Sequence, residues 1–302
     1  MTRERRLRIL RAVAATGLAI AWAGLLCRGK DGTVIAATLF YATPWLLRLM
    51  AGMLAACVLK HWGFRVMAAT CAIISLLEGW RSWRSDDLPL PFGGELSASV
   101  WNAGRHLDES PEAWPAVGKA DLSAVIECGS FSDDERGRFT AANPDHEWQR
   151  FDGSTMLGVR GKILSHESLG VHDLFRCHRV KVRLADQAEL TVIVVDVRSQ
   201  PWISREPSLA GILKAAAGDP KTIILGDFNT PLESKWFRPW REQGLTLAND
   251  GPRKGFRETW AYGLPLLTLD HIWLGPGWKP LRVDRSRHGS DHLMVNSLLG
   301  PR

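Results

Sequence analysis

The segment around Asp227 and Asn229 has the residue types and the spacing that hydrolytic chemistry requires. It reads Ile-Ile-Leu-Gly-Asp-Phe-Asn-Thr, an apolar run followed by glycine, a carboxylate and, two positions later, a carboxamide. Alternate side chains of an extended chain point to the same side, so both can face one site at a strand's end. A carboxylate can orient or deprotonate water, and an amide can donate to a phosphoryl oxygen. The segment also suits a turn that closes a buried strand, and alone it leaves both interpretations open.

Two Asp-His pairs lie further along the chain. Asp291-His292 comes directly before the apolar run 293–295, and Asp270-His271 begins another apolar run. An imidazole titrates near neutral pH and becomes an effective base when a carboxylate orients it. Each pair is also compatible with an ordinary turn at the start of a strand. The pairs therefore indicate acid/base or metal chemistry only in combination with other residues.

Two earlier β-rich segments also end in oxygen-bearing side chains. The segment 99–101 is followed by Asn102, and the run 124–126 is followed by Glu127. A glutamate that closes a buried strand is unfavourable unless it is paired or bound to a cation. Hard oxygen donors such as Asn, Glu and Asp favour Mg²⁺ or Mn²⁺ over zinc. We therefore expect a magnesium or manganese site that includes these side chains.

The order of these motifs along the chain resembles the endonuclease/exonuclease/phosphatase superfamily, which includes deoxyribonuclease I-like nucleases, neutral sphingomyelinases and inositol polyphosphate 5-phosphatases. The resemblance covers roughly residues 97–299 and rests on Trp-Asn, Ile-Glu, Gly-Asp-Phe-Asn, Asp-His and Ser-Asp-His in that order. It implies a four-layered α/β sandwich with two central mixed β-sheets, in a membrane-anchored member of bacterial type. It also implies that Glu127 is the main metal ligand, with Asn102 beside it and Asp291 supporting the metal side.

The same resemblance implies catalytic roles for four residues. Asp227 would position or activate the attacking water, and Asn229 would hold the phosphate. His292, oriented by Asp270, would contact the phosphoryl group or act as the base. The implied activity is divalent-metal-dependent hydrolysis of a phosphoester, whose identity as a lipid head group, a nucleic acid or a small phosphate ester stays open.

The chain departs from the superfamily pattern at Arg198. Many members carry Asn-x-His at the end of a central strand, where this chain has Asp196-Val197-Arg198. The change removes a candidate proton donor, although an arginine can bind phosphate by paired hydrogen bonds. Arg205, just before an expected helix, is a second candidate phosphate ligand. Both arginines can also be ordinary surface charges, and the missing histidine leaves open a phosphate-ligand binding or sensor module that has lost turnover.

Short β-rich runs with a few helices fill the chain after residue 96. The expected strands are 97–101, 122–127, 156–159, 175–184, 190–197, 222–225, 269–274 and 293–298. The fourth and fifth are separated by four residues, which predicts an antiparallel hairpin. The clearest helix is 207–217, whose apolar residues recur at helical spacing. The pattern predicts an α+β layered sandwich for residues 97–302.

Cys128 and Cys177 permit one disulfide. Four tryptophans either form an apolar rim around the site or lie in the core, and we favour the core: Trp202, Trp236, Trp240 and Trp260.

The first 84 residues form a candidate transmembrane anchor. Apolar stretches at about 9–27, 34–59 and 64–80 contain few charges, and about 20 apolar residues cross a hydrocarbon core. Pro44 and Arg48 predict a break within the second stretch. Basic residues before the first stretch, with Lys60 and Arg65 after the second, favour three spans and a catalytic domain on the extracytoplasmic side of the cell (inner) membrane. Two spans would leave that domain in the cytoplasm, and a buried hairpin of a soluble protein is the remaining alternative.

The net charge of +6 is divided unevenly along the chain. Residues 1–84 contain 12 Lys and Arg against 3 Asp and Glu, whereas residues 85–302 contain 26 against 29. The second part therefore lacks the basic footprint of a polynucleotide-binding domain. Residues 85–96 are rich in Pro, Gly and Asp and are expected to be a linker. The expected partners are a phosphoester substrate and the lipid bilayer, and the sequence identifies no protein partner.

Overall fold

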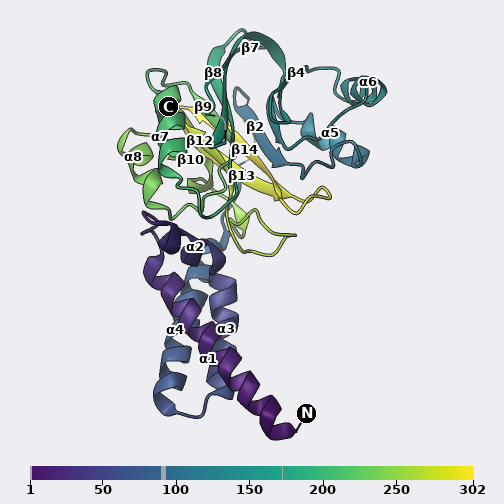
Figure 1. Ribbon diagram of the computed structural model, residues 1–302. Coiled ribbons are helices and arrows are strands. Elements are labelled where there is room, and N and C mark those ends of the chain that lie inside the picture. Colours follow the sequence, from purple (N-terminus) through teal and green to yellow (C-terminus); the bar gives the residue numbers. More distant parts are fainter. Residues whose placement is uncertain (1, 90–92, 172) are drawn as a thin grey trace.

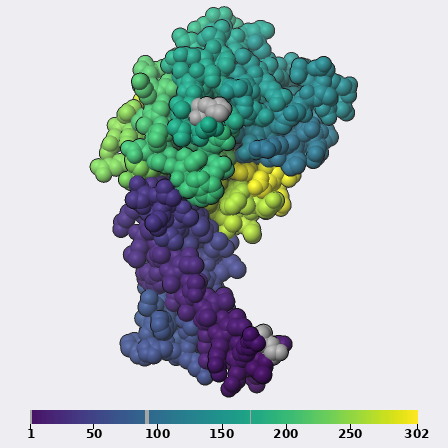
Figure 2. Space-filling model, viewed as in Figure 1, coloured from purple at the N-terminus to yellow at the C-terminus, as the bar shows by residue number. Residues whose placement is uncertain are grey.

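A wide two-sheet domain stands on a narrower bundle of helices (Figures 1 and 2). The structure is a computed structural model and describes residues 2–89, 93–171 and 173–302. Residues 90–92 of the expected linker lie outside the described residues. Where this segment begins, β1 (Arg84–Ser85) pairs with β11 (Lys254–Gly255). The chain is therefore held against the sheet domain directly after the last helix of the bundle.

The helical bundle consists of α1 (Arg3–Cys27), α2 (Val34–Ala42), α3 (Trp45–Val58) and α4 (Trp62–Ser82). Among the described residues, α1 and α4 are each long and apolar enough to cross a membrane. The pair α2 and α3 passes the same test only when taken together, and its axes bend by 73° at the break. That break falls at Thr43 and Pro44, where the proline predicts it, because a proline in a helix interior removes a hydrogen bond.

Two charged residues inside the apolar helices pair with each other. Arg48 of α3 is 2% exposed and forms an ion pair and hydrogen bond with Glu78 of α4. Arg28, just after α1, reaches the same glutamate at 3.1 Å and also binds Glu233 of the sheet domain at 2.9 Å. A buried charge is tolerated when an opposite charge and hydrogen bonds accompany it. This cluster therefore ties three segments of the helical bundle to the sheet domain.

The sheet domain contains two mixed sheets that, within the described residues, have six strands each. The order in the first sheet is β10 (Thr246–Leu247), β12 (Asp270–Leu274), β9 (Ile223–Asp227), β8 (Glu189–Val197), β7 (Phe175–Leu184) and β6 (Gly161–Ser168). The order in the second is β13 (Trp278–Ser286), β14 (Met294–Pro301), β2 (Leu96–Asn102), β3 (Leu122–Ile126), β5 (Thr155–Val159) and β4 (Glu147–Phe151). Only β8 with β9 and β2 with β3 pair in parallel among these described strands.

The two sheets pack face to face, and helices cover their outer faces. In β8, Val192 and Val194 belong to the central core, whereas Ile193 and Val195 point to the opposite face. That face is covered by α7 (Glu206–Ala216) and α8 (Arg238–Glu242), while α5 (Trp114–Val117) and α6 (Asp133–Ala142) cover the second sheet. Short 3₁₀ turns complete the connections: Pro111–Ala113, Lys235–Phe237 and Ala248–Asp250. The four-layered α+β sandwich with two mixed sheets is confirmed, and a strand buried on both faces explains its continuous apolar run.

The predicted hairpin is β7 with β8, and the predicted helix is α7, with Leu209, Ile212 and Leu213 buried. Cys128 and Cys177 are both buried free thiols that belong to different clusters, so the disulfide that the sequence permits does not form.

His271 is a neutral histidine in the outer core of the first sheet. Its ring stacks on Phe228 at 4.8 Å, its Nε2 lies 3.1 Å from the carbonyl of Thr268, and Trp273 Nε1 donates to its Nδ1. Burial lowers the pKa of His271 to about 4. The unfolded chain binds this proton near pH 6.5, so stability is intact above that pH and falls as the pH decreases toward 4.

We expect the pH dependence of unfolding to change when His271 is replaced by phenylalanine. Between pH 7 and pH 5 the buried histidine contributes a loss of about 2 kcal/mol in the free energy of unfolding, which the variant lacks. Thermal unfolding of the full chain in detergent, followed by tryptophan fluorescence, measures the difference. The exposed His106→Gln serves as control, and an unchanged slope in His271→Phe would contradict the assignment.

Candidate active site

Three carboxylates lie side by side at the ends of three neighbouring strands of the first sheet. Asp227 is the last residue of β9, and it is in register with Asp196 on β8 and with Asp270 at the start of β12. All three are buried. The glycine that precedes Asp227 has a physical reason, because a Cβ on Gly226 would lie 2.0 Å from the carbonyl oxygen of Val195.

The second sheet supplies the opposing residues. Asn102 ends β2 and Glu127 follows β3, and these two strands run parallel, so their ends meet at one edge. Asp291 and His292 lie just before β14, separated from it by Leu293, and β14 pairs with β2. The sheets are joined here by a 2.9 Å hydrogen bond from Asn102 Nδ2 to Asp227 Oδ2. The sequence motifs that are far apart along the chain therefore converge at one place.

Asp227 is 1% exposed and is held by two donors. Asn102 donates to its Oδ2, and the backbone N–H of Asn229 donates to its Oδ1 at 2.8 Å. Burial first, and then repulsion from Asp270, raise the pKa of Asp227 well above its usual range. A carboxyl group in such surroundings is poised for proton transfer near neutral pH rather than at acidic pH.

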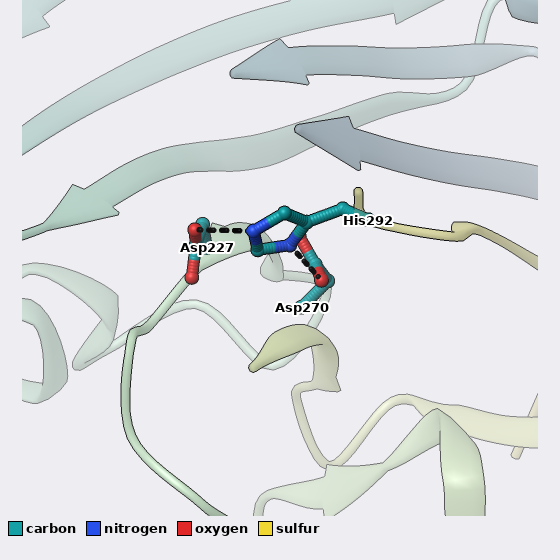
Figure 3. A group of neighbouring side chains, drawn as sticks. All are labelled: Asp227, Asp270 and His292. Atoms are coloured by element: carbon teal, nitrogen blue, oxygen red, sulfur yellow. Dashed lines mark hydrogen bonds and ion pairs between the residues drawn. The ribbon is translucent and has the colours of Figure 1, made fainter. Parts of the chain in front are cut away.

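The imidazole of His292 lies between two carboxylates (Figure 3). Its Nδ1 is 2.8 Å from Asp270 Oδ2, and its Nε2 is 4.0 Å from Asp227 Oδ2. Burial by itself would lower the pKa of His292, but Asp270 and the other nearby carboxylates outweigh it and raise the pKa to about 10. The ring is therefore a cation at neutral pH, with one nitrogen fixed by Asp270 and the other directed toward Asp227.

Glu127 and Asn229 adopt backbone conformations that non-glycine residues rarely populate. Their φ angles are 50° and 44°. Such left-handed conformations are of order 1–3 kcal/mol unfavourable and tend to be retained at functional sites. Both residues line the same cavity, so the strain is located where side-chain direction matters for binding.

A cavity of about 380 Å³ opens above these residues. Its floor includes Asn102, Glu127, Asp227, Asp291 and His292. Three of these five residues are carboxylates and only His292 can be cationic. The carboxylates and the Asn102 amide offer hard oxygen atoms as ligands. This donor set fits a divalent cation such as Mg²⁺ or Mn²⁺. Asp227, Asp270 and His292 also have ligand atoms within 4.8 Å of one another, but His292 Nδ1 is already bonded to Asp270.

The predicted phosphate-binding residues are placed differently from one another. Asn229 lines the cavity, and its side-chain Nδ2 donates one hydrogen bond to the carbonyl of Val197 at 2.8 Å. Arg198 is partly exposed, pairs with Asp173 at 3.0 Å and lines an adjoining cavity. Arg205 is 2% exposed.

Arg205 does not have the surroundings that direct phosphate contact requires. Its Nε donates to the carbonyl of Asn229 at 3.2 Å, and its two terminal nitrogens donate to the carbonyls of Ile203 and Ser199 at 3.2 and 3.1 Å. The guanidinium group is turned inward because these backbone acceptors surround it. Arg205 thus braces the Asn229 turn, in contrast to the phosphate contact expected from its position before a helix.

Several residues at the site were not predicted from the sequence. Asp196 is one of them: burial raises its pKa to about 6 against the opposing effect of Arg176. It is the second-to-last residue of β8, and an acidic residue at the end of an apolar run was the signal that could have identified it. Trp260 Nε1 donates to Asp291 Oδ2 at 2.8 Å. Trp260 was expected in the core together with Trp240, which is fully buried there, and no local pattern separates the two. Trp202, also expected in the core, is 64% exposed.

The protein is thus a two-sheet α+β sandwich in which the acidic ends of the strands meet a His-Asp pair. The sequence profile described as Endonuclease/Exonuclease/phosphatase family matches residues 73–292. The chain therefore belongs to this family, whose members hydrolyse phosphoesters. Among curated proteins the comparison finds no match.

Solved structures share the fold at low sequence identity. An endonuclease/exonuclease/phosphatase family protein from Bacteroides thetaiotaomicron is 16% identical, with a TM-score of 0.52 over 68% of this chain and 97% of that one. One from Beutenbergia cavernae is 15% identical, with a TM-score of 0.50 over 68% and 72%. ANGEL2, described as a 2',3'-cyclic phosphatase, is 11% identical, with a TM-score of 0.54 over 68% and 95%.

Proposed function

We propose that this protein is a divalent-metal-dependent hydrolase of phosphoester bonds that works at a membrane. The observation that carries the proposal is the convergence of Asp227 and the His292–Asp270 pair in one cavity with Asn102 and Glu127. These side chains come from both sheets and offer a base, a cation and oxygen ligands around one open space. A fold alone would not justify an activity, so the proposal rests on this site within a family of phosphoester hydrolases.

Asp227 is the residue that we assign to the attacking water. Its two oxygens are fixed by Asn102 and by the Asn229 N–H, so the carboxylate presents its remaining lone pairs in a constant direction. It accepts a proton as water attacks phosphorus. The bond between phosphorus and the leaving oxygen then breaks, the oxygen from water stays on phosphorus, and the alkoxide takes a proton from solvent in the open cavity.

His292 is assigned to the phosphoryl oxygens. Asp270 holds Nδ1, so Nε2 carries its hydrogen toward the space beside Asp227. A buried cation that is oriented before the reaction stabilises negative charge without reorganising, which is the largest single contribution in many hydrolases. The amide of Asn229 lies at the same cavity wall and adds a neutral donor.

The residues that would hold the metal are Glu127, Asn102 and Asp291. Asn102 Oδ1 accepts from the Gly104 N–H at 2.9 Å, and Asp291 is oriented by Trp260. A bound Mg²⁺ or Mn²⁺ supplies charge neutralisation for the phosphoryl and leaving oxygens.

Replacing Trp260 by phenylalanine is expected to weaken metal binding more than catalysis. The substitution keeps an aromatic ring but removes the Nε1–H group that donates to Asp291. Loss of a hydrogen-bond partner that orients a metal ligand lowers metal affinity by about 10- to 100-fold. We expect the Mg²⁺ concentration for half-maximal activity to rise by that factor, while kcat at saturating metal changes by less than about threefold. Exposed Trp202→Phe is the matched control. Equal metal requirements in both variants would refute the role of Trp260.

The test of the proposed function uses the full chain purified in detergent. Nucleic acids, phospholipids, sphingomyelin, inositol phosphates and bis(4-nitrophenyl) phosphate are assayed with Mg²⁺, with Mn²⁺ and with a chelator. We expect hydrolysis of at least one ester that the chelator abolishes and added metal restores. Binding of a phosphate ligand by calorimetry without turnover of any ester would instead identify a binding or sensor module.

The membrane topology that we propose has three spans and a catalytic domain on the extracytoplasmic side of the inner membrane. The N-terminus and the α3–α4 connection lie at the end of the bundle away from the sheet domain (Figure 1). Both carry basic residues, Arg3 to Arg11 in the first case and Lys60 and Arg65 in the second, and such residues favour the cytoplasm. A C-terminal reporter active only outside the cytoplasm tests this orientation, and cytoplasmic activity would overturn it.

A further inference from the structure

A helix of the anchor forms part of the wall of the catalytic cavity. Thr38, Tyr41 and Ala42 of α2 line the cavity together with Asp227 and His292. The anchor is therefore part of the site rather than only a tether. Figure 2 shows the purple surface of this region directly against the green surface of the sheet domain.

The position of α2 is fixed by hydrogen bonds centred on Asp31. Its carboxylate accepts from Tyr41 Oη at 2.8 Å, from Ser234 Oγ at 2.5 Å and from the Lys235 N–H at 3.1 Å. The backbone carbonyl of Asp31 accepts from Trp236 Nε1 at 3.3 Å. Asp31 is 5% exposed, so these bonds are shielded from water and hold the helix firmly on the sheet domain.

Tyr41 also connects α2 to the turn that carries Asn229. The guanidinium carbon of Arg205 lies 5.9 Å from the centre of the Tyr41 ring, while Arg205 Nε donates to the carbonyl of Asn229. This is a cation–π contact between an anchor residue and the brace of a catalytic turn. Arg205 thus contacts both the α2 wall of the cavity and the turn that carries Asn229.

The side of the cavity at α2 combines the hydroxyl of Thr38 with the apolar surface of Ala42 and of the Tyr41 ring, whose own hydroxyl is bonded to Asp31, and it adjoins the membrane segment. The sequence of α2 contains no charged residue, and α2 continues through a 73° bend into α3. On the sheet domain, Leu267 and Leu269 line the same cavity. Large exposed side chains lie within three residues of cavity-lining positions along the chain, namely Trp202 at 64%, Tyr262 at 66% and Leu264 at 56% exposure. Aromatic residues of this kind prefer the interface between a bilayer and water.

The other side of the site is polar and contains three arginines, each ion-paired with a carboxylate: Arg105 with Glu127, Arg176 with Asp196 and Arg198 with Asp173. An adjoining cavity of about 560 Å³ is lined by Arg105, Arg176 and Arg198, and it shares Glu127 and Asn229 with the catalytic cavity. Guanidinium groups offer five donors each and suit anionic oxygens. A molecule that occupies both cavities meets α2 and the catalytic residues in the first cavity and the arginines in the second.

We infer that the substrate is a membrane lipid whose phosphoester enters this site from the bilayer, with its apolar chains against α2 and its polar head group toward the arginines. This inference rests on the proposed function and narrows its substrate class. The charge and polarity of the two ends match an amphiphile in one orientation. A soluble phosphoester would leave the apolar surface of Ala42, Leu267 and Leu269 in the cavity without a partner.

The test compares lipids that differ only in their chains. The full chain is reconstituted in phosphatidylcholine vesicles, and phosphatidylglycerol, phosphatidic acid and phosphatidylinositol 4-phosphate are offered as dioleoyl lipids in the vesicle or as dihexanoyl lipids in solution. Bis(4-nitrophenyl) phosphate reports chemistry that needs no chain. We expect at least one dioleoyl lipid to be hydrolysed about tenfold faster or more than its dihexanoyl counterpart, because burial of two methylene groups already supplies such a preference.

Ala42→Trp tests the wall itself. Ala42 is exposed and lines the cavity, so an indole there occupies the space assigned to the chains. We expect the ratio of dioleoyl to dihexanoyl turnover to fall by about tenfold or more. Ala69→Trp is the matched control, because Ala69 is an exposed alanine of α4 that is not among the cavity-lining residues. Its ratio should equal that of the unaltered protein.

The outcomes separate the two proposals. Turnover of soluble esters without any chain preference, or a preference that Ala42→Trp leaves intact, overturns the lipid assignment while the hydrolase assignment stands. Failure to hydrolyse every ester, including bis(4-nitrophenyl) phosphate, with either metal overturns both.

Discussion

Asp227→Asn is expected to lower kcat/KM for phosphoester hydrolysis by about 10³-fold, the middle of the range for loss of a general base. The carboxylate is buried and bonded to Asn102 and to the Asn229 N–H, so its place is fixed by groups that the substitution leaves present. Asparagine has nearly the same shape but cannot take the proton from water. The loss should therefore appear in kcat, measured on the fastest ester of the panel with saturating metal.

The same variant should be folded, and it should be more stable than the unaltered protein when metal is chelated. Burial and Asp270 raise the pKa of Asp227, so the folded state resists ionisation of this group. A carboxyl whose folded pKa is raised destabilises the protein at any pH above its unfolded pKa near 4, and an amide removes that effect. Asp133→Asn on exposed α6 is the control. Activity within threefold of the unaltered protein would exclude Asp227 as the base.

The catalytic strand ends were predictable because two local signals coincide there. An apolar run followed by Gly226 and Asp227 combines a buried strand with a residue type that strands seldom bury. The structure aligns Asp227 with Asp270 through backbone pairing, which the sequence shows only as two separate Asp residues. Their convergence depends on the order of the strands, and the family resemblance supplied that order.

The edge strands were not predicted, for a physical reason. β6 and β13 are mostly exposed or half-buried, and their sequences mix charged and apolar residues without a continuous run. Edge strands are stabilised by pairing with a neighbour already in place, so their own residues need little hydrophobicity. β7 and β8, which are buried between layers, have the apolar residues that reveal a strand.

Contacts between distant segments explain the other differences. Arg205 was expected to face a phosphate because it precedes a helix, but backbone carbonyls of the 199–203 segment and of Asn229 surround its guanidinium group. Tyr41 reaches the catalytic cavity from a helix that reads as part of a membrane span. Neither contact leaves a pattern in the local sequence, because each depends on how the anchor docks on the sheet domain.

Glu127→Gln is the substitution expected to have the second largest effect, about 10²- to 10³-fold in activity at metal concentrations that saturate the unaltered protein. Glu127 is proposed as the main metal ligand, and glutamine keeps its size while removing the charge that attracts a divalent cation. The left-handed backbone at this residue is unaffected by the change, so the side chain should keep its direction.

A metal ligand and a base are distinguished by their response to metal concentration. If Glu127 binds the cation, raising Mg²⁺ or substituting Mn²⁺ should restore part of the activity of Glu127→Gln, whereas Asp227→Asn should not respond, because its metal ligands are intact. Mn²⁺ binding, followed by electron paramagnetic resonance, should weaken about 10- to 100-fold in the glutamine variant. Glu109→Gln, an exposed residue that pairs with His106, is the control. Unchanged Mn²⁺ affinity in Glu127→Gln would show that Glu127 is not the main metal ligand. The metal site would then be assigned to the buried group of Asp227, Asp270 and His292, whose ligand atoms lie within 4.8 Å of one another.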